Sequence, residues 1–349
     1  MAKILDGKIV RDKIAEELRS TISDLSSPPK LVIIQVGDNP ESNTYIRQKV
    51  LFGEKIGAIV KIEKLPNIIS EAELVGHINQ YNNDNNVHGI IVQMPIPDKF
   101  DKNEVIESIN SKKDVDGQTA TNIKLLFEGS TPVIASSSEA RAKQSDSEIA
   151  SSSSTPRNDK NSAGFIPATT KGIFTLLDFY KIPVAAKHVV VVGRSTLVGK
   201  PTALLALNKN ATVTICHSKT KNLAEVTKSA DILIVAAGKP KLITKNHVSK
   251  NQVVIDVGIN VLENPSVIAI KAKQSDYEIA SSSSTPRNDK LAKPETEPTD
   301  RKLVGDVDFE SVSKIVRAIS PVPSGIGPMT VASLFQNLLE AYKRQLDLS

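Results

Sequence analysis

Residues 31–49 read LVIIQVGDNPESNTYIRQK, and this stretch decides the fold. The apolar run Leu31–Val36 is typical of a buried strand, and the next four residues, Gly-Asp-Asn-Pro, end that strand and open a helix. Ser42, Tyr45 and Lys49 fall at i, i+3 and i+7 of the helix, so we expect them to point the same way on one face. Two interpretations are open: a solvated surface with a snorkelling lysine, or a face that holds a flat aromatic ligand and hands it a proton.

Strands and helices alternate over the first hundred residues, which predicts an α/β fold with a parallel sheet. The expected elements, in chain order, are an amphipathic helix over 8–25 that buries Ile9, Ile14, Leu18 and Ile22, a strand over 31–36, a helix over 41–56, a strand over 60–64, a helix over 71–82 and a strand over 87–94.

Two polar signals follow the expected strands. Gln93 is an amide at the end of the apolar run 87–94, and ligands of open α/β sheets bind outside the carboxyl ends of strands. It is either a buried glutamine satisfied by neighbouring backbone or a group that donates to and accepts from a heterocycle. Residues 113–117, Lys-Asp-Val-Asp-Gly, are either a plain turn or a turn that aims the Asp116 carboxylate into the same cleft as Lys49 and Gln93.

Composition limits the class of protein. At 349 residues the chain is long enough for two domains. No apolar run approaches the ~20 residues that span a bilayer, the first residues lack the apolar core of a signal peptide, and Cys216 is the single cysteine. We therefore expect a cytoplasmic protein without disulfides. The net charge of +5 is spread along the chain, so nucleic-acid binding is not expected, whereas small anionic ligands fit.

A serine-rich segment occurs twice. Residues 142–160 recur at 272–290, with Tyr277 in the second copy where the first has Ser147. Neither copy has the composition to bury a core, so we expect both to be exposed loops. They are interpreted as insertions of one mobile coding element, with a paired recognition site for a partner as the alternative.

The second half of the chain carries a nucleotide-binding pattern. The apolar strand 188–192 runs into Gly193-Arg-Ser-Thr-Leu-Val-Gly199 and an apolar helix through Leu207. Strand, glycine turn and helix form the arrangement in which backbone amides meet a pyrophosphate. The spacing is not the usual G-x-G-x-x-G, and a P-loop is excluded because five residues separate the glycines and Lys200 precedes a proline.

The following strand, 211–216, indicates which cofactor binds. It ends in Cys-His-Ser-Lys, with no carboxylate of the kind that binds the ribose 2′-hydroxyl of NAD. Arg194 in the glycine turn suits a 2′-phosphate instead and favours NADP; the alternative is a solvent-exposed arginine.

Further elements are expected in the second half of the chain: a helix over 171–181, strands over 231–237 and 253–257, and a loop over 320–330. A last helix, to about Lys343, is expected to return to the first domain and to pack through Val331, Leu334, Phe335, Leu338 and Leu339.

Taken together, these motifs resemble the bifunctional methylenetetrahydrofolate dehydrogenase/methenyltetrahydrofolate cyclohydrolase family of the FolD type. The matching stretches cover nearly the whole chain apart from the two serine-rich segments: Ser42-x-x-Tyr45-x-x-x-Lys49, Val92-Gln-Met-Pro-Ile-Pro97, Lys113-Asp-Val-Asp-Gly117, Val192-Gly-Arg-Ser195 with Val198-Gly199-x-Pro201, His217-Ser218, Asp256-Val-Gly-Ile-Asn260, Val304-Gly-Asp-Val307 and Pro321-Val-Pro-x-Gly-x-Gly-Pro-Met-Thr330.

The resemblance implies two α/β domains with the cleft between them and a homodimer formed through the cofactor domains. The folate-binding domain would be 1–133 with 328–349, and the Rossmann-type NADP-binding domain 164–327, with inserted loops at 134–163 and about 268–301. The implied reactions are oxidation of 5,10-methylenetetrahydrofolate with NADP and hydrolysis of the methenyl product to 10-formyltetrahydrofolate.

The resemblance also implies roles for individual residues. Lys49 would be the central catalytic residue, Tyr45 would flank the folate, and Gln93 and Asp116 would orient the pterin and tune the lysine. Further substrate contacts would come from Ser42, Val92, Met94, Pro323, Gly325 and Gly327. NADP would be held by Gly193, Arg194, Ser195, Ser218 and Ile259.

Some positions depart from the family pattern. Ser324 stands where glycine is usual, Ala168 and Thr170 replace a cysteine and a proline, and Gln118 replaces an aromatic or aliphatic residue. Three alternatives therefore stay open: a protein that keeps the fold with weak activity, a dehydrogenase without cyclohydrolase activity, and a non-catalytic NADP-binding regulator.

Overall fold

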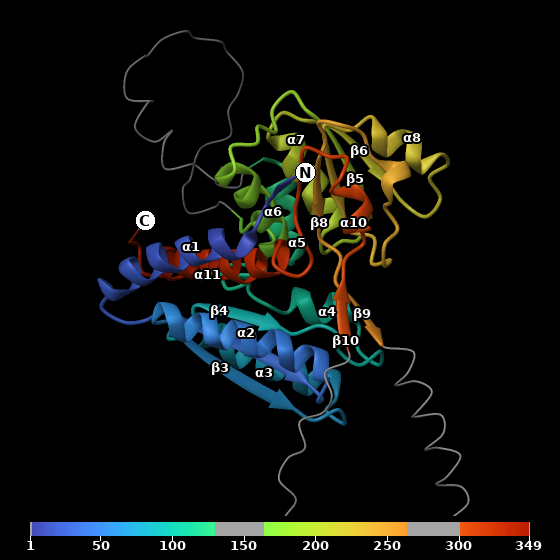
Figure 1. Cartoon of the computed structure of the whole chain (residues 1–349). Helices are drawn as coiled ribbons and strands as arrows, with labels where there is room; N and C mark the ends of the chain where they lie inside the picture. The colour runs from blue at the N-terminus through green and yellow to red at the C-terminus, as the bar shows by residue number, and fades with distance from the viewer. Residues whose placement is uncertain (1, 130–163, 264–300, 349) are drawn as a thin grey trace, which may run out of the picture.

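The computed structural model describes residues 2–129, 164–263 and 301–348 (Figure 1). Two parallel sheets lie on either side of a layer of helices. The smaller sheet has the order β3–β2–β4 and consists of β2 (Lys30–Val36), β3 (Ile59–Leu65) and β4 (Gly89–Val92). Its crossover helices are α2 (Pro40–Ile56) and α3 (Glu71–Asn83).

The larger sheet has six strands in the order β1–β11–β8–β7–β5–β6, all paired in parallel. Its members are β1 (Lys3–Ile4), β5 (His188–Val192), β6 (Thr212–Cys216), β7 (Ile232–Val235), β8 (Val253–Asp256) and β11 (Ala318–Ile319). The helices around it are α6 (Ala168–Phe179), α7 (Gly199–Asn208), α8 (Leu223–Lys228) and α10 (Phe309–Val312).

The helical layer between the sheets contains α1 (Gly7–Ser23) and α11 (Ile326–Gln345), which lie side by side (Figure 1). α11 also packs against α2 and α6, so the end of the chain contacts both halves of the molecule. Alternate residues of each sheet point into this layer: Leu31 and Ile33 share one apolar cluster with Val189 and Val191. The opposite faces form separate clusters, with α3 under the smaller sheet and α8 over the larger one.

The expected helix over 8–25 is present as α1, but the prediction for one of its buried residues was wrong. Ile9 is 57% exposed, and the buried stripe is Val10, Ile14, Leu18 and Ile22. These four are spaced by four residues and lie along one side, whereas Ile9 is one residue, about 100°, away from Val10.

Several short elements were not expected from the sequence. An antiparallel ribbon joins β9 (Asn260–Glu263) to β10 (Arg301–Val304), with Val304 opposite Asn260. The others are α4 (Lys102–Glu107), α5 (Ala120–Phe127) and the 3₁₀ turn Lys245–His247. Both serine-rich copies, 142–160 and 272–290, lie outside the described residues. Within the three described ranges, no helix is long and apolar enough to cross a membrane.

Candidate active site

Two side chains from different elements meet at the carboxyl end of β4. Lys49 of α2 donates from Nζ to Oε1 of Gln93 at 2.8 Å. Gln93 follows β4, is 8% exposed, and donates from Nε2 to the Met94 carbonyl at 2.7 Å. Because an ammonium can only donate, its bond to Oε1 fixes which end of the amide faces the lysine. The strand end predicted to bind ligand therefore holds Gln93 against Lys49.

The Asp116 carboxylate completes this group. It comes from the turn after the Ile90–Asp114 bridge, which lines that turn up beside β4. Burial raises the pKa of Asp116 to about 6; the charge of Lys49 opposes this shift, the charge of Asp114 adds to it, and a hydrogen bond donated by Gln118 opposes it. The structure thus brings Lys49, Gln93 and Asp116 into one cluster.

The pKa of Lys49 also moves. Burial lowers it, and the nearby charge of Asp116 opposes that shift without reversing it. The sequence left open which of the two effects prevails; in the structure it is burial. A lysine with a lowered pKa exchanges a proton more readily near neutral pH than an exposed one.

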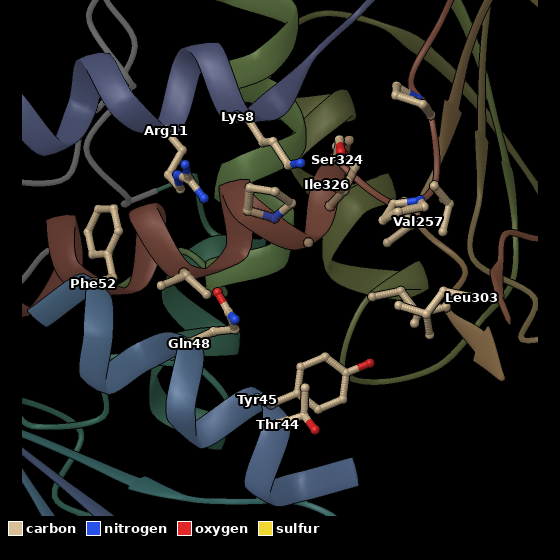
Figure 2. A pocket seen from close by; sticks show the side chains of 18 of the residues that line it. Lys8, Arg11, Thr44, Tyr45, Gln48, Phe52, Val257, Leu303, Ser324 and Ile326 are labelled. Atoms are coloured by element: carbon tan, nitrogen blue, oxygen red, sulfur yellow. The ribbon is translucent and has the colours of Figure 1, made fainter. Parts of the chain in front are cut away.

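Tyr45 lines a cavity of about 420 Å³ whose walls include none of Lys49, Gln93 and Asp116 (Figure 2). The cavity lies between α1, α2 and the loop that precedes α11, and Tyr45 is 42% exposed there. The expectation that Ser42, Tyr45 and Lys49 point the same way was only partly right. Ser42 is buried, with Oγ 3.4 Å from the Met94 carbonyl that also bonds Gln93. Residues i and i+7 differ by about 20° around a helix, whereas i+3 lies about 60° away, so Tyr45 turns toward the cavity.

The proline- and glycine-rich loop forms another wall of the cavity. Pro323, Ser324, Gly325 and Gly327 all line it. Ser324 has φ 91°, a conformation that L side chains rarely adopt, which gives a physical reason for glycine being usual there. Across from the loop, a Cβ on Gly7 would lie 1.9 Å from the Gly325 carbonyl oxygen, so α1 approaches this loop closely because Gly7 has no side chain.

Two further predicted substrate residues, Val92 and Met94, lie beneath the cluster. Val92 is 7% exposed and belongs to the apolar core of the smaller sheet, against which the partly buried Met94 packs. Val92 is largely buried, and Met94 presents its carbonyl to both Gln93 and Ser42. Neither residue lines the cavity, and their contact with substrate stays a prediction.

The predicted cofactor residues gather at the carboxyl ends of β5 and β6. Val192 pairs with Cys216, and the Gly193 amide donates to the Cys216 carbonyl at 2.9 Å, so the turns that carry Arg194 and Ser218 are neighbours. Both side chains are exposed. Ile259 is 40% exposed and lines the cavity from the opposite side.

The glycine turn lies close to neighbouring backbone. Gly193 has φ 129°, and a Cβ there would lie 2.1 Å from the Ala236 carbonyl; a Cβ on Gly199 would lie 2.4 Å from the Gly193 carbonyl. The turn can pack this tightly only because both residues lack side chains. Ser195 accepts from the amides of Val198 and Gly199 at 3.2 and 3.3 Å and so shapes the start of α7. With exposed Arg194 beside Ser218 and no carboxylate in the turn 217–221, these residues fit NADP.

Sequence reasoning missed two buried aspartates beside the cavity. Asp306 accepts hydrogen bonds from the backbone amides of Ala237, Gly238 and Lys239 at 2.6–2.8 Å. Asp256 accepts from the amides of Gly258, Asp306 and Val307 at 3.0–3.1 Å, and burial raises its pKa to about 7. The sequence feature that could have pointed to them is a glycine within two residues of each aspartate, in Asp256-Val-Gly and Gly-Asp306-Val. The two carboxylates hold the loops after β7 and β8 in place.

A metal centre finds no support in the part of the chain that the structure describes. No group of three or more His, Cys, Asp or Glu side chains is placed to hold an ion there. Cys216 is buried, and burial raises the pKa of its thiol.

Comparison with known protein families gives two matches. Residues 5–116 match the catalytic domain of tetrahydrofolate dehydrogenase/cyclohydrolase, and residues 167–346 match the NAD(P)-binding domain of the same family. The chain is 37% identical to the bifunctional protein FolD of Enterococcus faecalis, over 99% of this chain and all of that protein. It is 35% identical to the FolD protein of Rickettsia rickettsii, over 99% of this chain and 98% of that one.

Solved structures agree with these matches. The bifunctional FolD enzyme of Campylobacter jejuni superposes with a TM-score of 0.77 at 36% identity, covering 98% of this chain and 99% of that one. The methylenetetrahydrofolate dehydrogenase-cyclohydrolase of Trypanosoma brucei, solved with NADP and an inhibitor, gives a TM-score of 0.78 at 26% identity, covering 99% and 98%.

Proposed function

The chain belongs to the tetrahydrofolate dehydrogenase/cyclohydrolase family, and we propose that Lys49, Gln93 and Asp116 carry its folate chemistry. The protein oxidises 5,10-methylenetetrahydrofolate to the methenyl form with NADP and hydrolyses that product to 10-formyltetrahydrofolate. The observation that supports the residue assignment is the 2.8 Å bond from Lys49 to Gln93, with Asp116 close enough for its charge to act on the lysine.

In the first step the one-carbon bridge of the substrate loses a hydride. NADP, when bound, accepts that hydride. The contribution of this chain is orientation: Tyr45 supplies an aromatic wall of the cavity, and the Asp116 carboxylate accepts an N–H of the pterin. The lone pairs of the two bridge nitrogens stabilise the cation that forms as the hydride leaves, so this step needs no proton acceptor.

In the second step water adds to the cationic methenyl carbon. The first proton that the water loses passes to the Nζ of neutral Lys49 and is returned to the ring nitrogen as its bond to that carbon breaks. The remaining hydroxyl proton leaves to solvent as the formyl carbonyl forms, so the hydrolysis releases one proton overall. Burial raises the fraction of neutral lysine by lowering its pKa. Gln93 holds Nζ in place through Oε1, so the amine stays beside the site of attack.

The cofactor is NADP, and we assign its 2′-phosphate to Arg194 and Ser218. An arginine and a hydroxyl on neighbouring turns form charge-assisted bonds to a phosphate. The backbone at Gly193 and Ser195 would approach the pyrophosphate, and Ile259 would contact the cofactor from the far side of the cleft.

We also propose a cytoplasmic homodimer formed through the larger sheet. β6 is an edge strand of that sheet, and it presents Ile215, 41% exposed, next to Leu207, 57% exposed. An unprotected apolar edge is a pairing surface. Sedimentation should give a dimer that Ile215→Lys converts to monomer.

We further propose that the chain divides into a folate-binding domain, residues 1–133 with 328–349, and an NADP-binding domain, residues 164–327. In this division α11 belongs to the folate-binding domain, since it packs on α1 and α2.

A coupled assay tests the function. Purified protein is given 5,10-methylenetetrahydrofolate with NADP or NAD, and NADPH and the methenyl product are followed together. NADPH formation without methenyl accumulation is the expected result. Accumulation of the methenyl form would mean a dehydrogenase with an impaired Lys49 cluster, and no turnover with either cofactor would refute the enzymatic assignment.

A further inference from the structure

Asn337 of α11 is a buried amide that joins three segments of the chain. It is 2% exposed. Its Nδ2 donates to the carbonyls of Val115 and Ile166, both at 2.9 Å, and its Oδ1 accepts from Nζ of Lys171, also at 2.9 Å. All the hydrogen-bonding capacity of the side chain except one lone pair is thus used within the protein.

Lys171 fixes the orientation of this amide. An ammonium has donors only, so it selects Oδ1 and turns Nδ2 toward the two carbonyls. Lys171 belongs to α6, beside which α11 packs. The contact between these two helices therefore decides where Asn337 directs its donors.

The two carbonyls lie on either side of the Asp116 turn. Val115 immediately precedes Asp116, and Ile166 belongs to the segment that enters α6. The Ala168 amide at the start of α6 donates to the Asp116 carbonyl at 3.3 Å. A Cβ on Gly117, which has φ 69°, would lie 2.8 Å from the Phe165 carbonyl oxygen. Asn337 therefore joins the Asp116 turn to the entry of α6 by bonding one carbonyl on each.

The turn has support of its own on the other side. Asp114 accepts from the Thr119 amide at 2.7 Å and from Asn122 at 2.8 Å, and Asn122 accepts from the Phe165 amide at 3.0 Å. These bonds fix the shape of the turn, and the one from Phe165, like the Ala168 bond to Asp116, also ties it to the entry of α6. Asn337 adds the tie to α11, so its loss would leave a well-formed turn that can shift relative to that helix.

We propose that Asn337 is the residue that positions Asp116 for folate binding, so that packing of the C-terminal helix sets the geometry of the catalytic cluster. This inference rests on the proposed role of Asp116. A carboxylate displaced by a fraction of an ångström costs orientation in both reactions, since both use the same bound pterin.

The test compares Asn337→Ala with a matched control. Gln252 is also a buried amide that donates to two backbone carbonyls, those of Thr227 and Ala230 at 2.7 and 2.8 Å, but it lies at the amino end of β8. In Asn337→Ala we expect kcat/KM for the folate to fall about 10-fold in both reactions, with the KM for NADP unchanged within about twofold. Gln252→Ala should lower the unfolding midpoint by a similar amount and leave folate kinetics unchanged. Equal loss of folate kcat/KM in the two variants would overturn the proposal.

A double-mutant cycle separates positioning from general support. Calorimetry measures the affinity for tetrahydrofolate in wild type, Asn337→Ala, Asp116→Asn and the double variant. If Asn337 acts through Asp116, Asn337→Ala weakens binding about 10-fold in wild type and hardly at all in the Asp116→Asn background; additive losses would refute the idea. Asn337→Ser, which keeps one donor, replaces Asn337→Ala if that protein fails to fold. If Asp116→Asn alone leaves binding and turnover unchanged, the assignment of Asp116 fails instead, and the two failures are thereby distinguished.

Discussion

Replacing Lys49 by glutamine should stop hydrolysis while sparing oxidation. The Lys49→Gln side chain is one atom shorter than lysine but keeps an N–H donor directed toward Gln93, which Lys49 contacts at 2.8 Å in the structure. What it lacks is a proton acceptor. Positioned general acid–base groups typically contribute 10²- to 10⁴-fold, so we expect kcat for hydrolysis to fall by about that factor. The dehydrogenase needs orientation alone and should lose less than about 10-fold.

The assay follows NADPH and methenyl-folate absorbance in the same cuvette. Wild type should form NADPH without the methenyl product, whereas Lys49→Gln should accumulate methenyl-folate in step with NADPH. Lys64→Gln is the matched control, because Lys64 is an exposed lysine on β3, away from the cavity. Both variants lose one positive charge, so a general effect of charge would appear in both.

A second readout uses the pH dependence of oxidation. The charge of Lys49 opposes the burial that raises the pKa of Asp116 to about 6, so removing that charge should move the acid limb of the folate kcat/KM to higher pH. The ionised carboxylate would then be lost at pH 6–7 and retained at pH 9. Hydrolysis within twofold of wild type in Lys49→Gln would refute the role of the lysine, and an unmoved acid limb would refute its coupling to Asp116.

Four other changes have defined outcomes. Gln118→Leu removes a hydrogen bond that lowers the pKa of Asp116; the acid limb should rise while activity at pH 9 is kept, and a downward shift would contradict this assignment. Arg194→Ser should raise the KM for NADP about 10- to 100-fold, as expected for loss of a charged hydrogen bond, with the KM for NAD as the internal control; equal change for both cofactors would exclude a phosphate contact. Ser324→Gly relieves a positive φ worth about 1–2 kcal/mol, less about 0.4–1 kcal/mol of added chain entropy, so the urea midpoint should rise, and a lower midpoint would show that the loop is unstrained. Asp306→Ala leaves three part-buried backbone amides without their carboxylate acceptor and should destabilise the fold by roughly 1–3 kcal/mol, measured by urea unfolding; a loss below about 1 kcal/mol would show that water replaces the carboxylate.

Periodicity predicted the long elements of the fold, because each buries a continuous apolar face. β2, α2 and α3 lie within two residues of the expected ranges. Ile9 was assigned wrongly because a run of apolar residues at 9, 10, 14, 18 and 22 is compatible with two neighbouring stripes. β1 and β11 have two residues each, and their pairing joins residues more than 300 apart in the sequence, which no local pattern can indicate.

One strand end and one helix face carried separate sequence signals for residues that lie together in the structure. Gln93 and Lys49 were inferred separately, and the structure joins them. Asp256 and Asp306 were missed because their function is to accept backbone amides from loops distant in sequence, such as those of Ala237 and Gly238. A carboxylate that receives main-chain donors looks, in sequence, like any aspartate beside a glycine.

The pKa values of Lys49 and Asp116 are shifted in the directions opposite to those of an ordinary ion pair. An ordinary ion pair raises the pKa of its lysine and lowers that of its carboxylate, since each charge stabilises the other. Here both shifts run the opposite way: burial lowers the pKa of Lys49 and raises that of Asp116 to about 6. Desolvation therefore outweighs attraction, and both groups change protonation closer to neutral pH than they would in water. The sequence contained both residues but not the depth at which they lie, and that depth makes the lysine a usable base.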